Sequence, residues 1–95
     1  MPAGYIIANV NVTDPAQYEE YKKLSTLAME KHGAELLVRG GKSEVVEGSL
    51  FPRVVILKFP SFEAAKKYNE SAEYELARAK RQGAAQMNMI VVEGA

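Results

Sequence analysis

The chain has 95 residues, of which 47% are hydrophobic and 25% charged, a composition typical of one globular domain. Its 12 basic and 12 acidic residues cancel, so the chain has no net charge with which to attract nucleic acid or an anionic membrane. It contains no cysteine, which excludes disulfides, thiolate metal sites and a cysteine nucleophile.

The first part of the chain predicts a strand followed by a helix. Side chains alternate between two faces along Tyr5–Val12, as in a β-strand. Asp14 then suits the N-cap of a helix and Pro15 its first position, while Gly33 suits a left-handed cap at its end. The helical residues that we expect to be buried recur at three- and four-residue spacing and are Tyr21, Leu24, Leu27 and Ala28.

Residues 34–41 predict the second strand, and residues 42–48 continue it as extended chain. Gly40 and Gly41 interrupt this run. We interpret them as a bend within one long strand, Glu35–Glu47, because a two-residue hairpin turn here would add a fifth strand. Glycine also lets a ligand approach the backbone closely, so a role in binding stays open for both residues.

The second half of the chain predicts a third strand, two helical segments and a fourth strand. Residues 53–59 have a continuous apolar middle. Ser61 and Ser71 each suit the N-cap of a helix, and Gly83 suits the end of the second one. Residues 86–93 then predict the last strand. The order β-α-β-β-α-β favours an α+β ferredoxin-like domain over residues 1–95, with one four-stranded antiparallel sheet and helices on one face.

The strands are apolar on both faces, which indicates that the sheet is covered on both sides. Ile6 and Ile7 are adjacent, and Val54–Leu57 and Ile90–Val92 are unbroken apolar runs. A sheet with one wet face would alternate instead. At about 25 cal/mol per Å² of apolar surface, exposing one face would forfeit several kcal/mol. We therefore expect a symmetric homodimer formed through the open sheet face.

Several short motifs together resemble one known family. They are Arg39-Gly40-Gly41, Glu47-Gly48, Phe59-Pro60-Ser61 and the segment 71–74. Over Gly4–Gly94 the chain resembles the bacterial family called domain of unknown function thirteen-thirty, in the dimeric α/β-barrel superfamily. Ala72 is a departure, since members often carry proline there. The family has no established activity, so the resemblance implies a fold and a dimer. Related families include cofactor-free monooxygenases, isomerases and haem-degrading enzymes, and the fold does not fix the function.

Arg39 is the main candidate for ligand binding, because it ends an apolar strand beside the two glycines. Its guanidinium could anchor a carboxylate or oxyanion through two parallel hydrogen bonds. The alternative is an ion pair with a carboxylate such as Glu47, either within the subunit or across the dimer. Arg53 is open to the same two interpretations. Tyr68 and Tyr74 could either pack in the core or donate a hydrogen bond to a substrate oxygen.

Polar residues within the apolar strands must be hydrogen-bonded if they are buried. Tyr5, Asn9 and Asn88 are such residues, and they could pair with one another or line a polar cavity. His32, the single histidine, lies at a helix end, where we expect it to cap the helix or face solvent. The candidate ligand-binding residues are therefore Arg39, Gly40, Gly41, Glu47, Arg53, Tyr68, Ser71, Tyr74, Tyr5 and Asn9.

No motif in the sequence identifies a reaction, and whether the protein is an enzyme stays open. We expect a small-molecule-binding protein, or a cofactor-free enzyme, that acts on an acidic or oxygen-rich molecule. The alternatives are a non-catalytic structural or regulatory homodimer and a cofactor-independent monooxygenase of the superfamily type. We expect no cofactor or metal, because no spacing of His, Asp and Glu indicates a ligand set. No apolar block approaches the ~20 residues that span a bilayer, and we expect a cytoplasmic protein without nucleic-acid or membrane partners.

Overall fold

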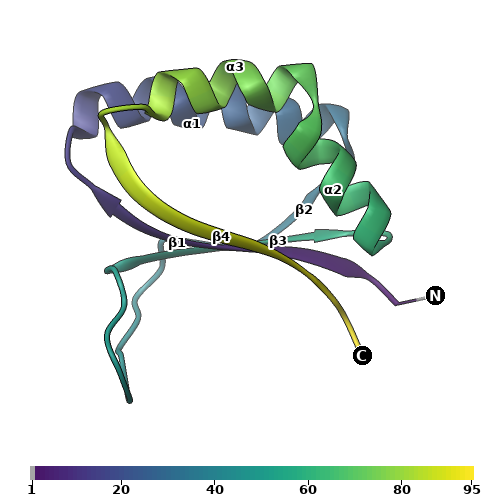
Figure 1. Ribbon diagram of the computed structural model, residues 1–95, viewed down its shortest axis with the longest axis horizontal. Helices are drawn as coiled ribbons and strands as arrows, with labels where there is room; N and C mark the ends of the chain where they lie inside the picture. Colours follow the sequence, from purple (N-terminus) through teal and green to yellow (C-terminus); the bar gives the residue numbers. More distant parts are fainter. Residues whose placement is uncertain (1) are drawn as a thin grey trace.

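The computed structural model describes residues 2–95 and confirms the predicted order of elements (Figure 1). All the helices lie on one face of the antiparallel sheet, and the second helical region is divided in two at Ser71. Within the described residues, the elements are β1 (Gly4–Val12), α1 (Pro15–Lys31), β2 (Glu35–Arg39), β3 (Arg53–Phe59), α2 (Phe62–Glu70), α3 (Ala72–Arg81) and β4 (Ala85–Glu93).

The sheet has the strand order β2-β3-β1-β4, so β1 lies between β3 and β4. Side chains alternate between the two faces along β1. Those of Ile6, Ala8 and Val10 point toward the helices and are at most 3% exposed. On the other face, Ile7 pairs with Ile56 of β3 and with Ile90 of β4. These isoleucines form an apolar row on the face that the helices leave open, and Ile90 is 56% exposed.

The predicted helix ends are confirmed by their capping hydrogen bonds. Asp14 Oδ1 accepts from the Gln17 amide at 3.2 Å, and Ser61 Oγ accepts from the Ala64 amide at 3.1 Å. Ser71 ends α2 and begins α3, because its hydroxyl donates to the Tyr68 carbonyl and accepts from the amide of Tyr74. Each cap satisfies a backbone group that the helix itself leaves unpaired.

The predicted buried stripe of α1 is wrong at one position. Leu27 is 61% exposed, whereas Tyr18, Ser25 and Met29 are buried beside Tyr21. At roughly 100° per residue, Leu27 lies on the side of the helix opposite Tyr18. The spacing 18-21-25-29 is the one that faces the sheet.

The predicted long bent strand is also wrong, because β2 ends at Arg39. Gly40 takes the left-handed conformation, with φ of +67°, and turns the chain away from the sheet. Residues 41–52, which we call the arm, then project beyond the face opposite the helices (Figure 1). No neighbouring strand of the described chain offers residues 41–47 a ladder of hydrogen bonds, so they are extended without forming a strand.

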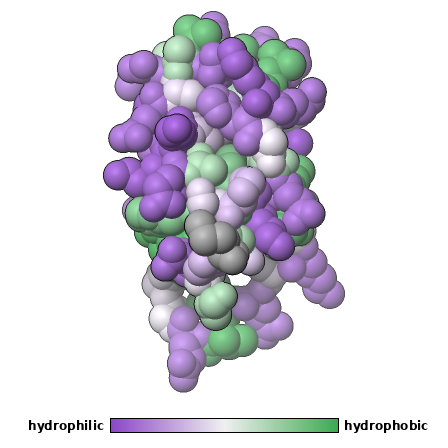
Figure 2. Space-filling model, turned by 90° about the vertical axis from the view of Figure 1, so that its right-hand side faces the viewer, coloured by the Kyte–Doolittle hydropathy of each residue, from purple (hydrophilic) through white to green (hydrophobic). Residues whose placement is uncertain are grey.

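Asn9 holds the base of the arm. Its side-chain amide donates to the carbonyl of Phe51 at 2.8 Å and to that of Arg53 at 3.1 Å, and its oxygen accepts from the Phe51 amide at 2.8 Å. Farther out in the arm, Val46 is 87% exposed and Leu50 is 61% exposed. Hydrophobic side chains are visible at the lower end of the molecule, below a helical layer covered mainly by hydrophilic ones (Figure 2).

Candidate functional site

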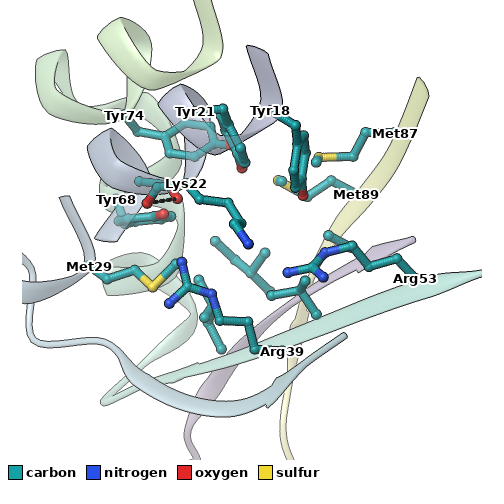
Figure 3. A pocket seen from close by; sticks show the side chains of 15 residues that line it. Tyr18, Tyr21, Lys22, Met29, Arg39, Arg53, Tyr68, Tyr74, Met87 and Met89 are labelled. Carbon is teal, nitrogen blue, oxygen red and sulfur yellow. Dashed lines mark hydrogen bonds between the residues drawn. The ribbon is translucent and has the colours of Figure 1, made fainter. Parts of the chain in front are cut away.

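A small cavity lies between the sheet and the helices, with a volume of about 30 Å³. Strands β1, β3 and β4 supply its apolar floor, and α1, α2 and α3 supply its roof (Figure 3). No Asp or Glu is among the described residues that surround it. The lining residues are Ile6, Ala8, Tyr18, Tyr21, Lys22, Ser25, Met29, Arg39, Arg53, Val55, Leu57, Tyr68, Tyr74, Met87 and Met89.

Four buried tyrosines form the roof, and we call Tyr18, Tyr21, Tyr74 and Tyr68 the tyrosine wall. Neighbouring ring centroids along this row are 5.2, 6.2 and 5.0 Å apart. Such tilted and edge-on contacts stabilise aromatic pairs beyond the burial of their surface. The Tyr21 and Tyr74 hydroxyls also share a hydrogen bond of 2.8 Å. The wall is therefore a packed part of the core as well as a surface of the cavity.

Burial keeps the phenols of Tyr21 and Tyr68 protonated. It raises the pKa of Tyr21 far above its ordinary value, and the neighbouring Tyr74 adds to this rise through its charge and its hydrogen bond. Burial also raises the pKa of Tyr68, against a smaller lowering by the charge of Arg39. At neutral pH the hydroxyls of Tyr21 and Tyr68 can therefore donate hydrogen bonds to a ligand, but they cannot act as bases.

Three basic side chains also line the cavity, Arg39 and Arg53 on the strand side and Lys22 on the helical side, and we call them the cationic rim (Figure 3). Lys22 comes from α1 and is paired with Glu19 at 3.0 Å. The two arginines come from neighbouring strands that are joined by the hydrogen bond from the Gly40 amide to the Val54 carbonyl. This pairing brings both guanidiniums to the same end of the sheet.

Neither arginine of the rim has a carboxylate within ion-pair distance among residues 2–95. Arg39 donates instead to the Thr26 hydroxyl at 2.8 Å, and the guanidinium of Arg53 lies 5.6 Å from the centre of the Tyr18 ring. The ion pair between Arg39 and Glu47, which the sequence left open, is therefore not formed within the chain. Two arginines without acidic partners beside a cavity without acidic lining make a site suited to an anion.

The structure brings five of the sequence candidates to one place. Arg39, Arg53, Tyr68 and Tyr74 line the cavity, and Gly40 packs beside it against the guanidinium of Arg53. Tyr68 and Tyr74 are core residues, as the first interpretation expected, and both also line the cavity. Donation of a hydrogen bond to a substrate oxygen stays a prediction.

The other five candidates lie elsewhere. Tyr5 is on the sheet face away from the cavity, next to Gly94. Asn9 is occupied by the base of the arm, and Ser71 by the two helix ends. The remaining two, Gly41 and Glu47, are exposed in the arm. Of the other polar residues in the strands, Asn88 lies opposite Asn9 on the open face and is exposed.

Several lining residues were not assigned to a site from the sequence. Tyr18, Lys22, Ser25 and Met29 follow the helical spacing 18-22-25-29, which could have shown that they share one face of α1 with Tyr21. Met87 and Met89 lie on one face of the predicted last strand, since side chains alternate along a strand, but nothing in the sequence connected that face with the helix. His32 caps α1, as expected, and its Nε2 lies 2.9 Å from Oε1 of Glu73, outside the cavity.

Other kinds of site find little support in the described residues. Within residues 2–95, no helix is long and apolar enough to cross a membrane. The same residues contain no group of three or more His, Asp and Glu side chains placed to hold a metal ion. The helix–sheet cavity is the candidate functional site.

The fold and the position of this cavity define an α+β protein of the ferredoxin-like kind. The chain belongs to the family described as "Domain of unknown function (DUF1330)", whose model matches residues 3–95. This match confirms the resemblance that the sequence motifs indicated. A comparison with curated proteins gave no match.

Solved structures with the same fold come from several bacteria. A protein of unknown function from Rhodopseudomonas palustris has a TM-score of 0.77 and 18% identity, over 99% of this chain and 83% of its own. SnoaB from Streptomyces nogalater, described as a cofactor-independent oxygenase, has a TM-score of 0.70 and 10% identity, over 100% and 95%. A dimeric, ferredoxin-like protein of unknown function from Bacteroides fragilis has a TM-score of 0.65 and 12% identity, over 96% and 95%. At these identities the likeness is one of fold.

Proposed function

We propose that this protein is a homodimer that binds a small acidic molecule in the cavity between the sheet and the helices, with Arg39 and Arg53 facing the acid group. The observation that carries the proposal is the pair of arginines, which come from neighbouring strands and lack carboxylate partners within residues 2–95. A guanidinium matches a carboxylate with two parallel, charge-assisted hydrogen bonds. An anion between the two arginines would also relieve the repulsion between their charges.

The remainder of the cavity suits the less polar part of such a ligand. Its floor is formed by aliphatic side chains such as Val55 and Leu57, and its roof by the tyrosine wall. The Tyr68 hydroxyl forms no hydrogen bond with the described residues. This phenol stays protonated, so it can donate to a ligand oxygen that has entered beyond the arginines.

The composition of the site favours binding over acid–base catalysis. A general base works best when its pKa lies near the working pH. Burial moves the phenols of Tyr21 and Tyr68 away from that range, and His32 is engaged with Glu73 outside the cavity. We therefore expect a reaction in this site to use a substrate that is itself acidic.

A cofactor-independent oxygenase is the second candidate, and the cationic rim is the observation that favours it. In such chemistry the substrate is deprotonated to a phenolate or enolate, which supplies the electrons that reduce O₂. One oxygen atom enters the substrate and the other leaves as water. Arg39 and Arg53 would stabilise the substrate anion electrostatically. The Streptomyces protein of the same fold is described as an enzyme of this class.

The dimer is supported by the apolar row on the open sheet face and by the exposed valine and leucine side chains of the arm. The Bacteroides fragilis protein of the same fold is described as dimeric. Sedimentation equilibrium at micromolar concentration should give twice the chain mass. A folded, monodisperse monomer under those conditions would contradict this part of the proposal.

Isothermal titration calorimetry tests the binding proposal. A set of small carboxylates should contain ligands that the protein binds, while the matched primary amides, which lack the charge, should not bind. Replacing both arginines by lysine, Arg39→Lys together with Arg53→Lys, should weaken binding about tenfold or more without unfolding the protein, because lysine lacks the forked geometry. Equal heats for the acids and their amides, or none for either, would reject the site.

A further inference from the structure

Arg53 has a buried nitrogen without a partner. Its Nε is inaccessible to solvent and forms no hydrogen bond with residues 2–95. A buried N–H group of a cation without an acceptor is costly, and native proteins rarely leave one unsatisfied. Because Arg53 also lines the cavity, an acceptor that enters the cavity is the simplest way to satisfy this group.

The surroundings of Arg53 fix the place of its guanidinium. The Tyr18 ring lies on it from α1, at 5.6 Å from ring centre to Cζ. Gly40 lies against it from the end of β2, where a Cβ atom would overlap Nη1. A guanidinium packed against an aromatic ring and a backbone without a side chain is already oriented before a ligand arrives, which lowers the entropic cost of binding.

We propose, on the basis of the function proposed above, that Arg53 is the residue that receives the carboxylate and that the ligand is an aromatic acid. The Nε and one terminal nitrogen of an arginine form a fork that a carboxylate can occupy with both oxygens. Arg39 is more exposed and hydrogen-bonded to Thr26, and it lies at the mouth, where it attracts the anion. Its role is secondary to that of Arg53.

The choice of an aromatic body follows from the walls of the cavity. The present volume of about 30 Å³ is far below the roughly 150 Å³ of a cavity that holds benzene, so side chains must move for a ligand to enter. The tyrosine wall is fixed by its ring contacts and its hydrogen bond. Met29, Met87 and Met89 are flexible and unbranched, and they can make room. A flat ring needs the smallest movement and gains contacts with both sulfur and aromatic groups.

The ligand class can be tested by calorimetry with three probes: benzoate, cyclohexanecarboxylate and benzamide. Benzoate should bind about tenfold or more tightly than cyclohexanecarboxylate, which has the same charge but a thicker ring, and benzamide should not bind. Equal affinity for the two acids would overturn the inference while leaving the binding of acids intact. Binding of neither acid would also overturn the inference, and the absence of binding across the wider set of carboxylates would reject the proposed function itself.

The role of Arg53 is tested by comparing Arg53→Lys with Arg39→Lys. The Arg53 variant should lose about tenfold or more of the benzoate affinity, and the Arg39 variant should lose less. The opposite ranking would show that Arg39 receives the acid, which overturns this inference but not the proposed function. Circular dichroism of both variants checks that each remains folded.

Gly40 offers a test with a matched control. Gly40 and Gly33 have the same φ of +67°, so alanine is strained equally at both, but only at Gly40 would the new methyl group meet Arg53. Gly40→Ala should therefore lose benzoate affinity about tenfold or more, whereas Gly33→Ala should bind as the unaltered protein does. Unchanged affinity in a folded Gly40→Ala variant would contradict the proposed place of the carboxylate.

Discussion

The tyrosine wall and the cationic rim line one cavity, and they differ in the contacts that their side chains make within the protein. The tyrosines contact one another ring to ring, and two of their hydroxyls share a hydrogen bond. The rim arginines have no acidic partner within residues 2–95, and Arg53 keeps one buried nitrogen without an acceptor. Aromatic rings that pack against one another stabilise the fold, whereas a buried cationic group without an acceptor can be satisfied by a ligand. The wall should therefore govern stability, and the rim should govern binding.

The largest expected effect is on the wall. Tyr68 is 1% exposed and contacts both Phe59 and Tyr74, with ring centroids 5.2 and 5.0 Å away. Tyr68→Ala should lower the free energy of unfolding by about 3–5 kcal/mol, as expected for removing a buried aromatic ring. Arg53→Ala should change it by less than about 1 kcal/mol. Urea denaturation at one fixed protein concentration measures both, and equal losses would remove the distinction between the wall and the rim.

The two glycines beside the rim should differ from each other. Gly40 has φ of +67° and packs against Arg53, whereas Gly41 has an ordinary φ and no neighbouring atoms within 4 Å of a new Cβ. Gly40→Val should lose at least about 1–2 kcal/mol, the usual cost of left-handed backbone in an L-residue. Gly41→Val should stay within about 0.5 kcal/mol of the unaltered protein. Thermal melting distinguishes them, and a similar loss in both variants would contradict the structure at this bend.

A smaller effect is expected from the hydroxyl pair in the wall. Tyr21→Phe removes the 2.8 Å hydrogen bond to Tyr74 and should lower the free energy of unfolding by about 1 kcal/mol. Tyr18→Phe is the control, because the Tyr18 hydroxyl forms no hydrogen bond with the described residues. Chemical denaturation should show a loss only in the Tyr21 variant. If the two variants are equally stable, the hydroxyl pair does not contribute to the wall.

The smallest effect concerns Glu73, outside the cavity. Hydrogen bonds from His32 and then from Lys31 lower the pKa of this carboxyl to about 2 from its ordinary 4.5. The folded state therefore binds fewer protons than the unfolded state between these values. The stability that Glu73 contributes is present above pH 4.5 and is lost as the pH falls toward 2.

Glu73→Gln should flatten this pH dependence. Glu75→Gln, in the same turn of α3 but without an ion pair among residues 2–95, should leave it unchanged. Denaturation curves recorded at intervals from pH 5 to pH 2 provide the comparison. An identical acid dependence in the Glu73 variant and the unaltered protein would show that the pair with His32 does not stabilise the fold.

The sequence predicted the fold well because its local patterns agreed with one another. The N-caps at Asp14, Ser61 and Ser71, and the alternation along β1, all point to the observed elements. Leu27 was misplaced because the apolar spacing along α1 fits more than one face, and only packing against the sheet selects 18-21-25-29. Part of the arm was wrongly predicted to continue the second strand. Extended backbone forms a strand only when a neighbouring strand offers it hydrogen bonds, and a local sequence pattern does not show whether such a neighbour exists.

The candidate site was predictable only in part. Arg39 stood out because it ends an apolar strand beside two glycines, and Arg53 was open to the same interpretations. The register of β2 and β3 shows why both line one cavity. Tyr18 and the methionines did not stand out, since apolar and aromatic residues are expected in any core. Asn9 was a candidate because it is a polar residue within an apolar strand. Its hydrogen bonds to the arm account for this polar side chain without a ligand.

The central claim is that the rim arginines bind an acid, and NMR of the arginine Nε–H groups tests it most directly. The chain has four arginines, so each signal can be assigned by substitution. On addition of benzoate the signals of Arg53 and Arg39 should shift with one common dissociation constant, and benzamide should shift neither. Arg78, whose guanidinium donates to the Asn69 carbonyl at 2.7 Å, provides the internal control and should not move. Unchanged Arg39 and Arg53 signals at saturating benzoate, or equal shifts at Arg78, would contradict the claim.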